Sequence, residues 1–457
     1  MIGFIYNQEF ATEAYLRQWQ RMADATGTDF MAVFVVYTSS SSTTNGSFLP
    51  LSGYQAGDFK RNTTGALSVR ALSRLAKRQP GYPGVKVLSY NIMMVGTASA
   101  VWRERPDWVN FDRTGQPIVD TQGMRLSLDI SSSEAREYYR RNILATLADM
   151  ETDGVYLDYG ILAYGTPNWR AGRVANTADY VAFESAISQG LRSWAPRRGV
   201  LIANSPGNPL ADNNFNELGS GVWSNTRSIA MSLQEGKIFT PVGGTPSHLY
   251  CYDKRNFLAF GAAVGSLPTY SPRTPAQFND FVDTIAPFVR VALALRDAVP
   301  VPARVRTAVG ADYNNITMNH HFEFIAMQTQ WGGVVTAILT SRGPPMSPPG
   351  YWPRCPGTVS IDVGWLGAVS SGDIQLQQLA MRDPGTTCGN STTAPLPSAF
   401  QALPNATVPV AISGTRLIWP VHCFRPGELS FATMLVIGSA RNTTAADAFV
   451  RTATRQM

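Results

Sequence analysis

The sequence predicts an α/β fold, a (β/α)8 barrel over residues 1–300 that is followed by an antiparallel β-sandwich over residues 301–457. Strand-length apolar runs alternate with amphipathic helical stretches through the first part, which is typical of parallel βαβ units, and eight alternations are the number that closes a barrel. After residue 300 the helical periodicity gives way to short alternating runs broken by Pro, Gly and Ser, which indicates a sandwich. A doubly wound open sheet is the alternative, although no glycine-rich turn follows the first strand.

The apolar runs of the first part have the length and composition of buried strands. They are Ile2–Tyr6, Phe30–Tyr37, Val85–Tyr90, Gly154–Leu157, Val200–Ala203, Val222–Trp223, His248–Tyr252 and Ala262–Leu267. Between them, apolar residues at spacings of three and four predict helices. These are Ala11–Thr26, Thr64–Arg78, Ser133–Glu151, Ala178–Trp194 and Thr274–Ala298. The Ser-Ser-Ser-Glu sequence at 131–134 predicts an N-cap and an acidic first turn for the third of them.

The last third predicts strands joined by Pro-rich and Ser-rich loops. Residues 299–303 (VPVPA) have the composition of a stiff linker between the two domains. The predicted strands of the sandwich are Phe324–Gln328, Gly333–Thr340, Val359–Val363, Leu417–Val421 and Leu429–Ile437.

The amino-acid composition indicates which kinds of molecule the protein is expected to bind. Charged residues are 15% of the chain and the formal net charge is +6, but only five of the 38 basic residues are Lys. The Arg residues are scattered, with no basic run that contains aromatics, so we expect no nucleic-acid binding. A polar, weakly charged surface suits an extracellular protein that faces neutral ligands. The longest apolar run, Phe30–Tyr37, is too short to cross a membrane, so no membrane span is expected.

The cysteines and sequons bear on the compartment. An even number of cysteines allows two disulfides, of which Cys355–Cys388 is favoured because it closes a loop region, and free thiols are equally compatible with the count. The four are Cys251, Cys355, Cys388 and Cys423. Asn-x-Ser/Thr sequons begin at Asn45, Asn62, Asn315, Asn390, Asn405 and Asn442. We therefore expect an extracellular or secretory-pathway glycoprotein, although Met1 leads directly into the first strand without the basic segment of a signal peptide.

Catalytic residues of a barrel lie where its strands end. Asp158 follows an unbroken strand, and a carboxylate in such a position could attack a sugar anomeric carbon. An Asp that caps the next helix or binds an Arg fits the spacing equally well. Other polar or aromatic residues at or near the strand ends are candidate substrate-binding groups. They are Asn7, Tyr37, Asn91, Tyr156, Asn204, Trp223, Asn225 and Asp253.

Several stretches in one order resemble the α-galactosidases of the melibiase type, whose pattern is HPDW…GRP…LDLSNPEVRDY…IDYIKWD. The matching stretches are 105–109 (RPDWV), 115–117 (GQP), 125–131 (RLSLDIS), 134–138 (EAREY) and 153–158 (DGVYLD). Weaker similarity extends over residues 1–300. The resemblance implies a barrel followed by a β-sandwich, retaining hydrolysis of an α-glycoside, and Asp158 as the nucleophile.

This sequence departs from the family at the groups that hold the sugar and donate the proton. The family's Lys and Trp before the nucleophile are Tyr156 and Leu157, and Tyr37 begins the segment that replaces its paired aspartates. Asn225 stands nearest to the acid/base position, and an amide cannot donate and retake a proton. A retaining enzyme needs a second carboxyl about 5–5.5 Å from the first. Asp212 and Glu217 are the candidates for it, and Asp253 is the next.

Two hypotheses follow for the protein. The first is a retaining glycoside hydrolase that acts on an oligosaccharide, a polysaccharide or a glycoconjugate, and a transglycosidase would use the same residues. The second is a non-catalytic relative that binds carbohydrate or has a structural role. Trp223 is the best candidate for stacking on a sugar ring, whereas core packing is expected for Trp108. We expect no metal and no cofactor, because the His residues lack ligand spacing, and the sequence leaves the oligomeric state open.

Overall fold

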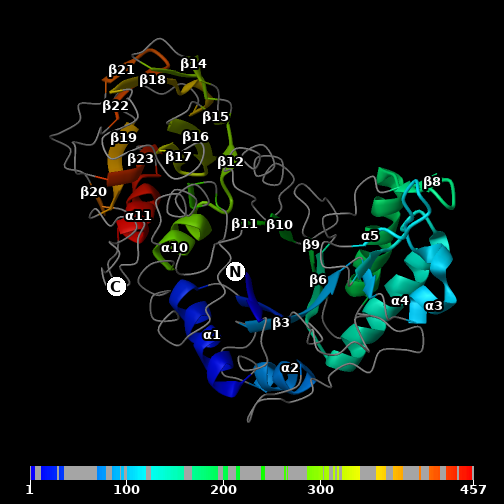
Figure 1. The fold of residues 1–457 in the computed structure, drawn as a ribbon. Coiled ribbons are helices and arrows are strands. Elements are labelled where there is room, and N and C mark those ends of the chain that lie inside the picture. Colours follow the sequence, from blue (N-terminus) through cyan, green and yellow to red (C-terminus); the bar gives the residue numbers. More distant parts are fainter. Residues whose placement is uncertain are drawn as a thin grey trace. The chain divides into compact units, whose positions relative to one another are not determined.

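A computed structural model describes residues 2–5, 12–27, 30–34, 69–78, 85–92, 94–96, 100–119, 125–158, 167–193, 199–203, 213–216, 238–241, 262–263, 265, 286–301, 303–307, 312–313, 316–318, 322–339, 357–366, 374–383, 401–402, 411–421, 429–439 and 442–454. The chain divides into two compact units, residues 2–24 with 28–215 and residues 25–27 with 216–457, and each is described by itself (Figure 1).

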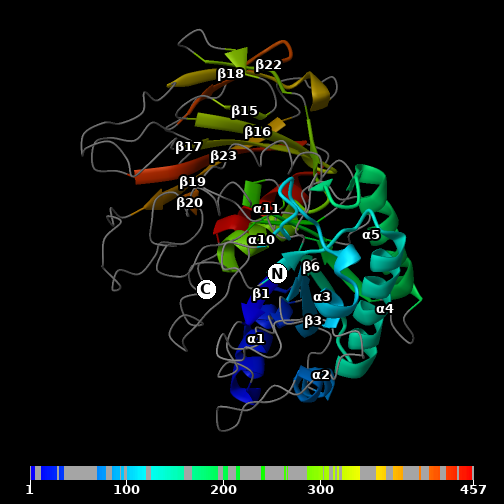
Figure 2. The ribbon, with the colours of Figure 1, turned by 45° about the vertical axis from the view of Figure 1, so that its right-hand side comes forward.

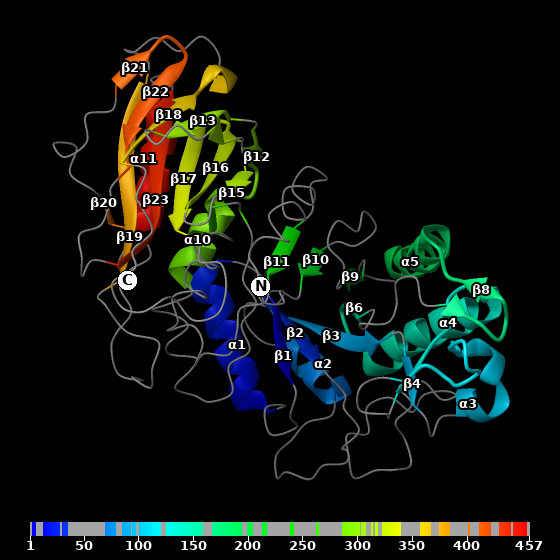
Figure 3. The same ribbon diagram turned by 45° about the horizontal axis from the view of Figure 1, so that its top comes forward.

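The N-terminal unit is built on a parallel sheet. Its described strands are neighbours in the order β1 (Ile2–Ile5), β2 (Phe30–Phe34), β3 (Val85–Ile92), β6 (Gly154–Asp158), β9 (Val200–Ala203) and β10 (Asn213–Asn216). Each pair is parallel (Figure 3). Five of these strands were predicted, and β10 was not. The described strands follow one another across the sheet in the order of the sequence. A doubly wound sheet would reverse this order at its centre, so the observed order favours the predicted barrel.

The later strands predicted for the barrel give a mixed result. The predicted strands Val222–Trp223 and His248–Tyr252 lie outside the described residues. The strand predicted at Ala262–Leu267 is wrong, because Ala262 and Ala263 are helical and Gly265 is in a turn with φ +72°. A Cβ at Gly265 would lie 2.9 Å from the carbonyl oxygen of Leu295, so both its φ and its surroundings favour glycine there. A closed eight-stranded barrel stays a prediction, because two of its predicted strands lie outside the described residues.

Helices follow the strands of this sheet. They are α1 (Glu13–Thr26), α2 (Val69–Arg78), α4 (Ser133–Met150) and α5 (Thr177–Arg192). The predicted cap of α4 is confirmed, since the Ser132 hydroxyl accepts from the Ala135 amide at 3.3 Å. A capping box that was not predicted starts α5, in which the Asn176 and Asp179 side chains each accept from the other's backbone N–H. Helix α4 ends at Glu151, whose φ of +54° makes the turn into β6.

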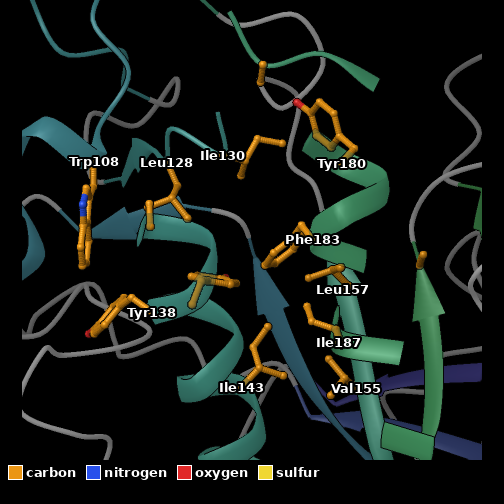
Figure 4. Packing of buried hydrophobic residues seen from close by; sticks show 14 of the residues in the cluster. Trp108, Leu128, Ile130, Tyr138, Ile143, Val155, Leu157, Tyr180, Phe183 and Ile187 are labelled. Carbon is orange, nitrogen blue, oxygen red and sulfur yellow. The ribbon is translucent and has the colours of Figure 1, made fainter. Parts of the chain in front are cut away.

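Helices α4 and α5 cover one face of β6. Val155 and Leu157 of β6 are fully buried in one cluster with Ile143 of α4 and with Phe183 and Ile187 of α5 (Figure 4). Every second residue of β6 points to the helices, as the pleat of a strand requires. The alternate residues Gly154, Tyr156 and Asp158 therefore belong to the opposite face.

Two excursions interrupt the alternation of strands and helices, one after β3 and one after β6. The first contains β4 (Met94–Gly96), α3 (Ala100–Glu104), the 3-10 turn η2 (Pro106–Trp108) and β5 (Arg125–Ser127), which pairs antiparallel with β4. The second contains a hairpin of β7 (Pro167–Asn168) and β8 (Arg173–Val174). Since both leave the carboxyl ends of parallel strands, they lie at the edge of the sheet where Asp158 ends β6.

The C-terminal unit contains an antiparallel β-sandwich (Figure 2). One sheet has the order β12 (Val299–Pro300), β16 (Phe322–Thr329), β17 (Gly332–Leu339), β23 (Leu429–Ser439), β19 (Ile374–Asp383) and β20 (Gln401–Ala402), with β15 (Ile316–Met318) also paired to β16. The other sheet has the order β14 (Asp312–Tyr313), β13 (Val305–Thr307), β18 (Thr358–Asp362), β22 (Arg416–Pro420) and β21 (Ala411–Ser413).

Alternate residues of the two sheets meet in one core. Phe324 and Leu435 from the first sheet and Ile361 and Trp419 from the second are buried together, which is the pattern that the sequence predicts for a sandwich. The five predicted strands are all present with slightly different bounds. The linker predicted at 299–303 is wrong, because Val299 and Pro300 pair with β16 and place these residues in the sheet. Pro300 is tolerated because β12 is at the edge of its sheet.

One helix packs on the first sheet of the sandwich, and a second helix packs against it. Helix α11 (Thr443–Thr454) packs against β23 and β19 and against α10 (Ala286–Ala294). Phe449 of α11 and Trp331 lie with ring centroids 5.3 Å apart. The strand β11 (Ile238–Pro241) and the 3-10 turn η3 (Gly364–Leu366) complete the described elements of this unit. No helix in the described part of the chain has the length and apolarity needed to span a bilayer.

Candidate functional site

The candidate site is the face of β3 and β6 that points away from α4 and α5. Tyr156 is 2% exposed on this face, and its ring stacks on that of Tyr90 in β3 with centroids 5.6 Å apart and planes 13° apart. The register pairs Tyr90 with Tyr156 and Ile92 with Asp158, so Asp158 occupies the next position on the face after the two tyrosines. Asp158 is the last residue of β6 and therefore stands at the carboxyl end of the sheet.

The start of β6 fixes the position of its end. The Asp153 carboxylate accepts from the amide of Val87 at 2.9 Å, and the Asp153 amide donates to the carbonyl of Val87 at 2.7 Å. A Cβ at Gly154 would lie 2.1 Å from the carbonyl oxygen of Val200, so only glycine allows β9 to approach this closely. These contacts set the register of β6 between β3 and β9, and with it the backbone position of Asp158.

Asn91 was predicted to bind substrate, but the structure places it on the other face. It pairs with Leu157, whose side chain is packed under the helices, and it is 4% exposed. Its Nδ2 donates to the carbonyl and the hydroxyl oxygen of Ser89, both at 3.2 Å. The predicted strand ended at Tyr90, directly before Asn91, whereas β3 continues to Ile92, so Asn91 lies within the pleat. We therefore leave Asn91 out of the proposed site.

The remaining predicted site residues are not brought together by the described part of the chain. Only Tyr156, Asp158 and Asn91 of the predicted set lie within it. Asn7, Tyr37, Asn204, Asp212, Glu217, Trp223, Asn225 and Asp253 lie outside the described residues, as do Cys251, Cys355, Cys388 and Cys423. The second carboxyl and the disulfides thus stay predictions. Within the described residues, no three His, Cys, Asp or Glu side chains gather in a way that could hold a metal ion.

The stretch that carries the family resemblance has a structural role near its start. The Arg105 guanidinium bonds to Asp107 at 2.9 Å and to Glu134 at 2.5 Å, and it lies 4.0 Å from the ring centroid of Trp108. Its hydrogen bonds are the main cause that lowers the pKa of both carboxyls. Trp108 is 5% exposed and lies 5.1 Å from the ring of Tyr138, so the expected core packing of Trp108 is confirmed. These residues dock the first excursion on α4.

A buried carboxylate joins the two excursions. Asp129 is 1% exposed and accepts from Nδ2 of Asn168 at 2.8 Å, from Nη2 of Arg173 at 2.7 Å and from the amide of Ser131 at 3.0 Å. Nδ2 of Asn168 also donates to the carbonyl of Val109 at 3.1 Å. The sequence predicted no role for Asp129, which appeared only as part of the stretch 125–131 that resembles the family. An Asp between two apolar residues, Leu128 and Ile130, is a signal in the sequence that could have indicated a buried carboxylate with a charged partner.

A second set of contacts holds the same two excursions together, and we call it the clasp. It comprises Phe111 and Arg113 of the first excursion and Trp169 and Arg170 of the second. The Trp169 amide donates to the carbonyl of Phe111 at 2.9 Å. Arg113 lies 4.6 Å from the ring centroid of Trp169, and Arg170 lies 4.9 Å from that of Phe111. Each excursion therefore supplies one ring and one cation to the other.

Comparison with known proteins gives a likeness of fold. No protein-family model matches the sequence, and no curated protein matches it. A solved structure of a cycloisomaltooligosaccharide glucanotransferase from Paenibacillus sp., complexed with cycloisomaltoheptaose, is similar over 95% of this chain and 84% of its own, with a TM-score of 0.55 and 10% identity. The likeness covers nearly the whole of both chains and shows that they share a fold.

Two further structures are similar at lower TM-scores. A noncanonic maltogenic α-amylase from Thermotoga neapolitana is similar over 94% of this chain and 97% of its own, with a TM-score of 0.49 and 10% identity. A cycloalternan-degrading enzyme from Trueperella pyogenes is similar over 65% of this chain and 46% of its own, with a TM-score of 0.44 and 16% identity. The glucanotransferase is not an α-galactosidase, so this likeness of fold does not extend to the α-galactosidase part of the resemblance.

Proposed function

We propose that the protein acts on an α-glycosidic bond of an oligosaccharide by a retaining two-carboxylate mechanism, with Asp158 as the nucleophile. The observation that carries this proposal is the place of Asp158. It ends a central parallel strand, on the face opposite the helix layer and next to the buried Tyr156. Residues at the carboxyl ends of such strands carry the chemistry of α/β barrels. The shared fold with a glucanotransferase is consistent with this chemistry.

The reaction needs two carboxyl groups in different protonation states. The Asp158 carboxylate forms a bond to the anomeric carbon while the bond from that carbon to the leaving oxygen breaks, and a carboxylic acid gives its proton to that oxygen. In the second step the resulting carboxylate takes a proton from water or a sugar hydroxyl. The oxygen of this acceptor attacks the anomeric carbon, and the ester bond to Asp158 breaks. Water gives hydrolysis, whereas a sugar gives transglycosylation.

We propose Glu217 ahead of Asp212 as the acid/base. Strand β10 is parallel to β9, which is parallel to β6, so the carboxyl ends of all three strands lie at one edge of the sheet. In the sequence, Glu217 directly follows Asn216, the last residue of β10, whereas Asp212 directly precedes Asn213, its first residue. By its place in the sequence, Glu217 thus comes directly after the carboxyl end of β10, whereas Asp158 is the last residue of β6.

The proposal is tested by the chemistry of an Asp158→Ala variant. We expect wild-type protein to hydrolyse at least one member of a panel of aryl α-glycosides, and Asp158→Ala to be at least about a thousandfold slower. Sodium azide should restore cleavage in the variant and give a glycosyl azide of inverted anomeric configuration, because azide occupies the place of the missing carboxylate. Asp297→Asn, which changes an exposed carboxylate in the other unit, is the matched control and should retain wild-type rates.

Two outcomes would overturn this proposal. If Asp158→Ala hydrolysed the aryl glycosides at the wild-type rate, Asp158 would not be the nucleophile. If wild-type protein bound oligosaccharides but turned over none of the panel, the non-catalytic carbohydrate-binding hypothesis would replace the enzymatic one. That alternative is supported by Asn225, the residue that the sequence resemblance places nearest to the acid/base position, because an amide cannot donate and retake a proton.

A further inference from the structure

The clasp presents two guanidinium groups that have no anionic partner among the residues that the structure describes. Arg113 and Arg170 are exposed, and within the described part of the chain neither forms an ion pair or a side-chain hydrogen bond. A guanidinium that contacts an aromatic ring through its face keeps its N–H donors in the plane of the group, where they can reach a ligand. Arg173, the other arginine of the hairpin that contains Arg170, is already paired with Asp129.

Asp112, which precedes Arg113 in the sequence, uses its carboxylate for hydrogen bonds within its own turn. Oδ1 of Asp112 accepts from the amide and the hydroxyl of Thr114 at 2.8 and 2.7 Å and from the amide of Gln116 at 2.9 Å. These bonds lower the pKa of Asp112 and hold its carboxylate within its own turn. The positive charge of the clasp is therefore not neutralised by the residue next to Arg113.

An exposed aromatic ring lies beside these two cations. Trp169 is 47% exposed, although its backbone is fixed to Phe111 and its neighbour Asn168 is buried and bonded to Asp129. An indole held rigidly in water loses little conformational entropy when a ring stacks on it. Sugar rings present a face of C–H groups that packs on such aromatic surfaces.

We propose that the clasp is a binding surface for an acidic oligosaccharide, in which a pyranose ring contacts Trp169 and uronate carboxylates bind Arg113 and Arg170. The planar carboxylate matches the forked donors of a guanidinium. The surface belongs to the excursions that leave the carboxyl ends of β3 and β6, the edge at which Asp158 ends its strand. This inference rests on the proposed function, because it assigns to that reaction a glycan that carries negative charge.

The test compares two ligands that share their sugar rings and linkages, one with charged carboxylates and one with neutral methyl esters in their place. The binding of α-linked tetragalacturonate and of its methyl ester to the wild-type protein is measured by titration calorimetry at low and moderate NaCl. We expect the acid to bind at least about tenfold more tightly than the ester at low salt, and the difference to shrink as salt screens the charges. The ester keeps the ring and the linkage, so stacking alone would favour neither ligand.

Variants assign the binding to the clasp. The double variant Arg113→Gln/Arg170→Gln should abolish the preference for the acid, and Trp169→Ala should weaken both ligands by about fivefold or more. Arg113→Lys/Arg170→Lys keeps the charge and should keep part of the preference, which separates loss of charge from loss of packing. Val174→Thr changes an exposed residue of the same hairpin and should bind like the wild type.

Equal binding of acid and ester by the wild-type protein would overturn the inference, and so would an unchanged preference in the Gln double variant. The experiment measures binding and not turnover. It can therefore contradict the binding surface without contradicting the proposed glycosidase function, and the reverse is also true. A protein that binds the acid through the clasp but cleaves no α-glycoside would keep this inference and lose the proposed function. A protein that cleaves neutral α-glycosides without a preference for the acid would do the reverse.

Discussion

Asp129 accepts a hydrogen bond from Asn168 at 2.8 Å in a place where each residue is only 1% exposed to solvent. The two residues belong to excursions that leave different strands, so the bond joins parts of the chain that follow β3 and β6. A buried carboxylate that loses its donors cannot turn to water instead, nor can the buried Asn168, whereas the partly exposed Arg173 can.

We predict that Asp129→Ala lowers the free energy of unfolding by about 3 kcal/mol, since it leaves Asn168 and Arg173 without their acceptor. Asp129→Asn should lower it less, because an amide oxygen can still accept one of the bonds. Chemical denaturation measures both changes, with the exposed Asp297→Asn as the control. A loss below about 0.5 kcal/mol for Asp129→Ala would contradict the role assigned to this carboxylate.

Arg105 makes stability depend on pH through Asp107 and Glu134. Its hydrogen bonds lower the pKa of both carboxyls below their ordinary values of 3.8 and 4.5. A carboxyl whose pKa is lower in the folded state stabilises the protein above its unfolded pKa, and this stabilisation is lost as the pH falls through the folded pKa. We predict that the melting temperature of the wild type falls below about pH 4.5 more steeply than that of Asp107→Asn/Glu134→Gln. Parallel curves for the two proteins between pH 3 and 6 would refute the coupling.

Asn91 provides a test of which face of β3 the substrate meets. Asn91→Ala removes the bonds to Ser89 within the helix-covered face, and we expect it to cost about 1–2 kcal/mol of stability. It should leave kcat/KM for any aryl glycoside that the wild type cleaves within about twofold at a temperature where the variant is folded. A tenfold rise in KM with unchanged stability would instead place Asn91 in the site.

The strands of the parallel sheet were predictable because their apolar runs are short, β-branched and separated by helical stretches. Asn91 shows what such runs do not determine. Ending β3 at Tyr90 instead of Ile92 placed Asn91 beyond the strand, where a polar side chain could have faced the site. Register and face depend on pairing with β6, which is a long-range contact.

The candidate site was predictable in part. The position of Asp158 at the end of its strand was correct, and the resembling stretch drew attention to residues 105–158. Most of that stretch packs the excursions and does not show sugar-binding chemistry, since Arg105, Trp108 and Asp129 are all engaged with other protein groups. The clasp was missed because it pairs two segments far apart in the sequence, and only folding brings Arg113 to Trp169.

The acid/base residue can be identified from how the loss of rate in a variant depends on the leaving group of the substrate. We predict that Glu217→Gln slows an aryl α-glycoside with a poor leaving group by at least about a hundredfold. For a substrate whose leaving group needs no protonation, the same variant should slow the first step of the reaction far less. Asp212→Asn should affect both substrates equally and weakly. The opposite pattern, with the selective loss in Asp212→Asn, would reverse the assignment.

The buried bond between Asp129 and Asn168 has a consequence for protein engineering. Loop exchange between related enzymes normally treats the segment after each strand as a separate cassette. Here a transplanted 94–130 segment would arrive with the buried Asp129 side chain but without its donors Asn168 and Arg173, and a transplanted 159–176 segment would arrive with those donors but without Asp129. The two segments should therefore be exchanged between scaffolds as one unit, and chimaeras that carry only one of them should be poorly folded.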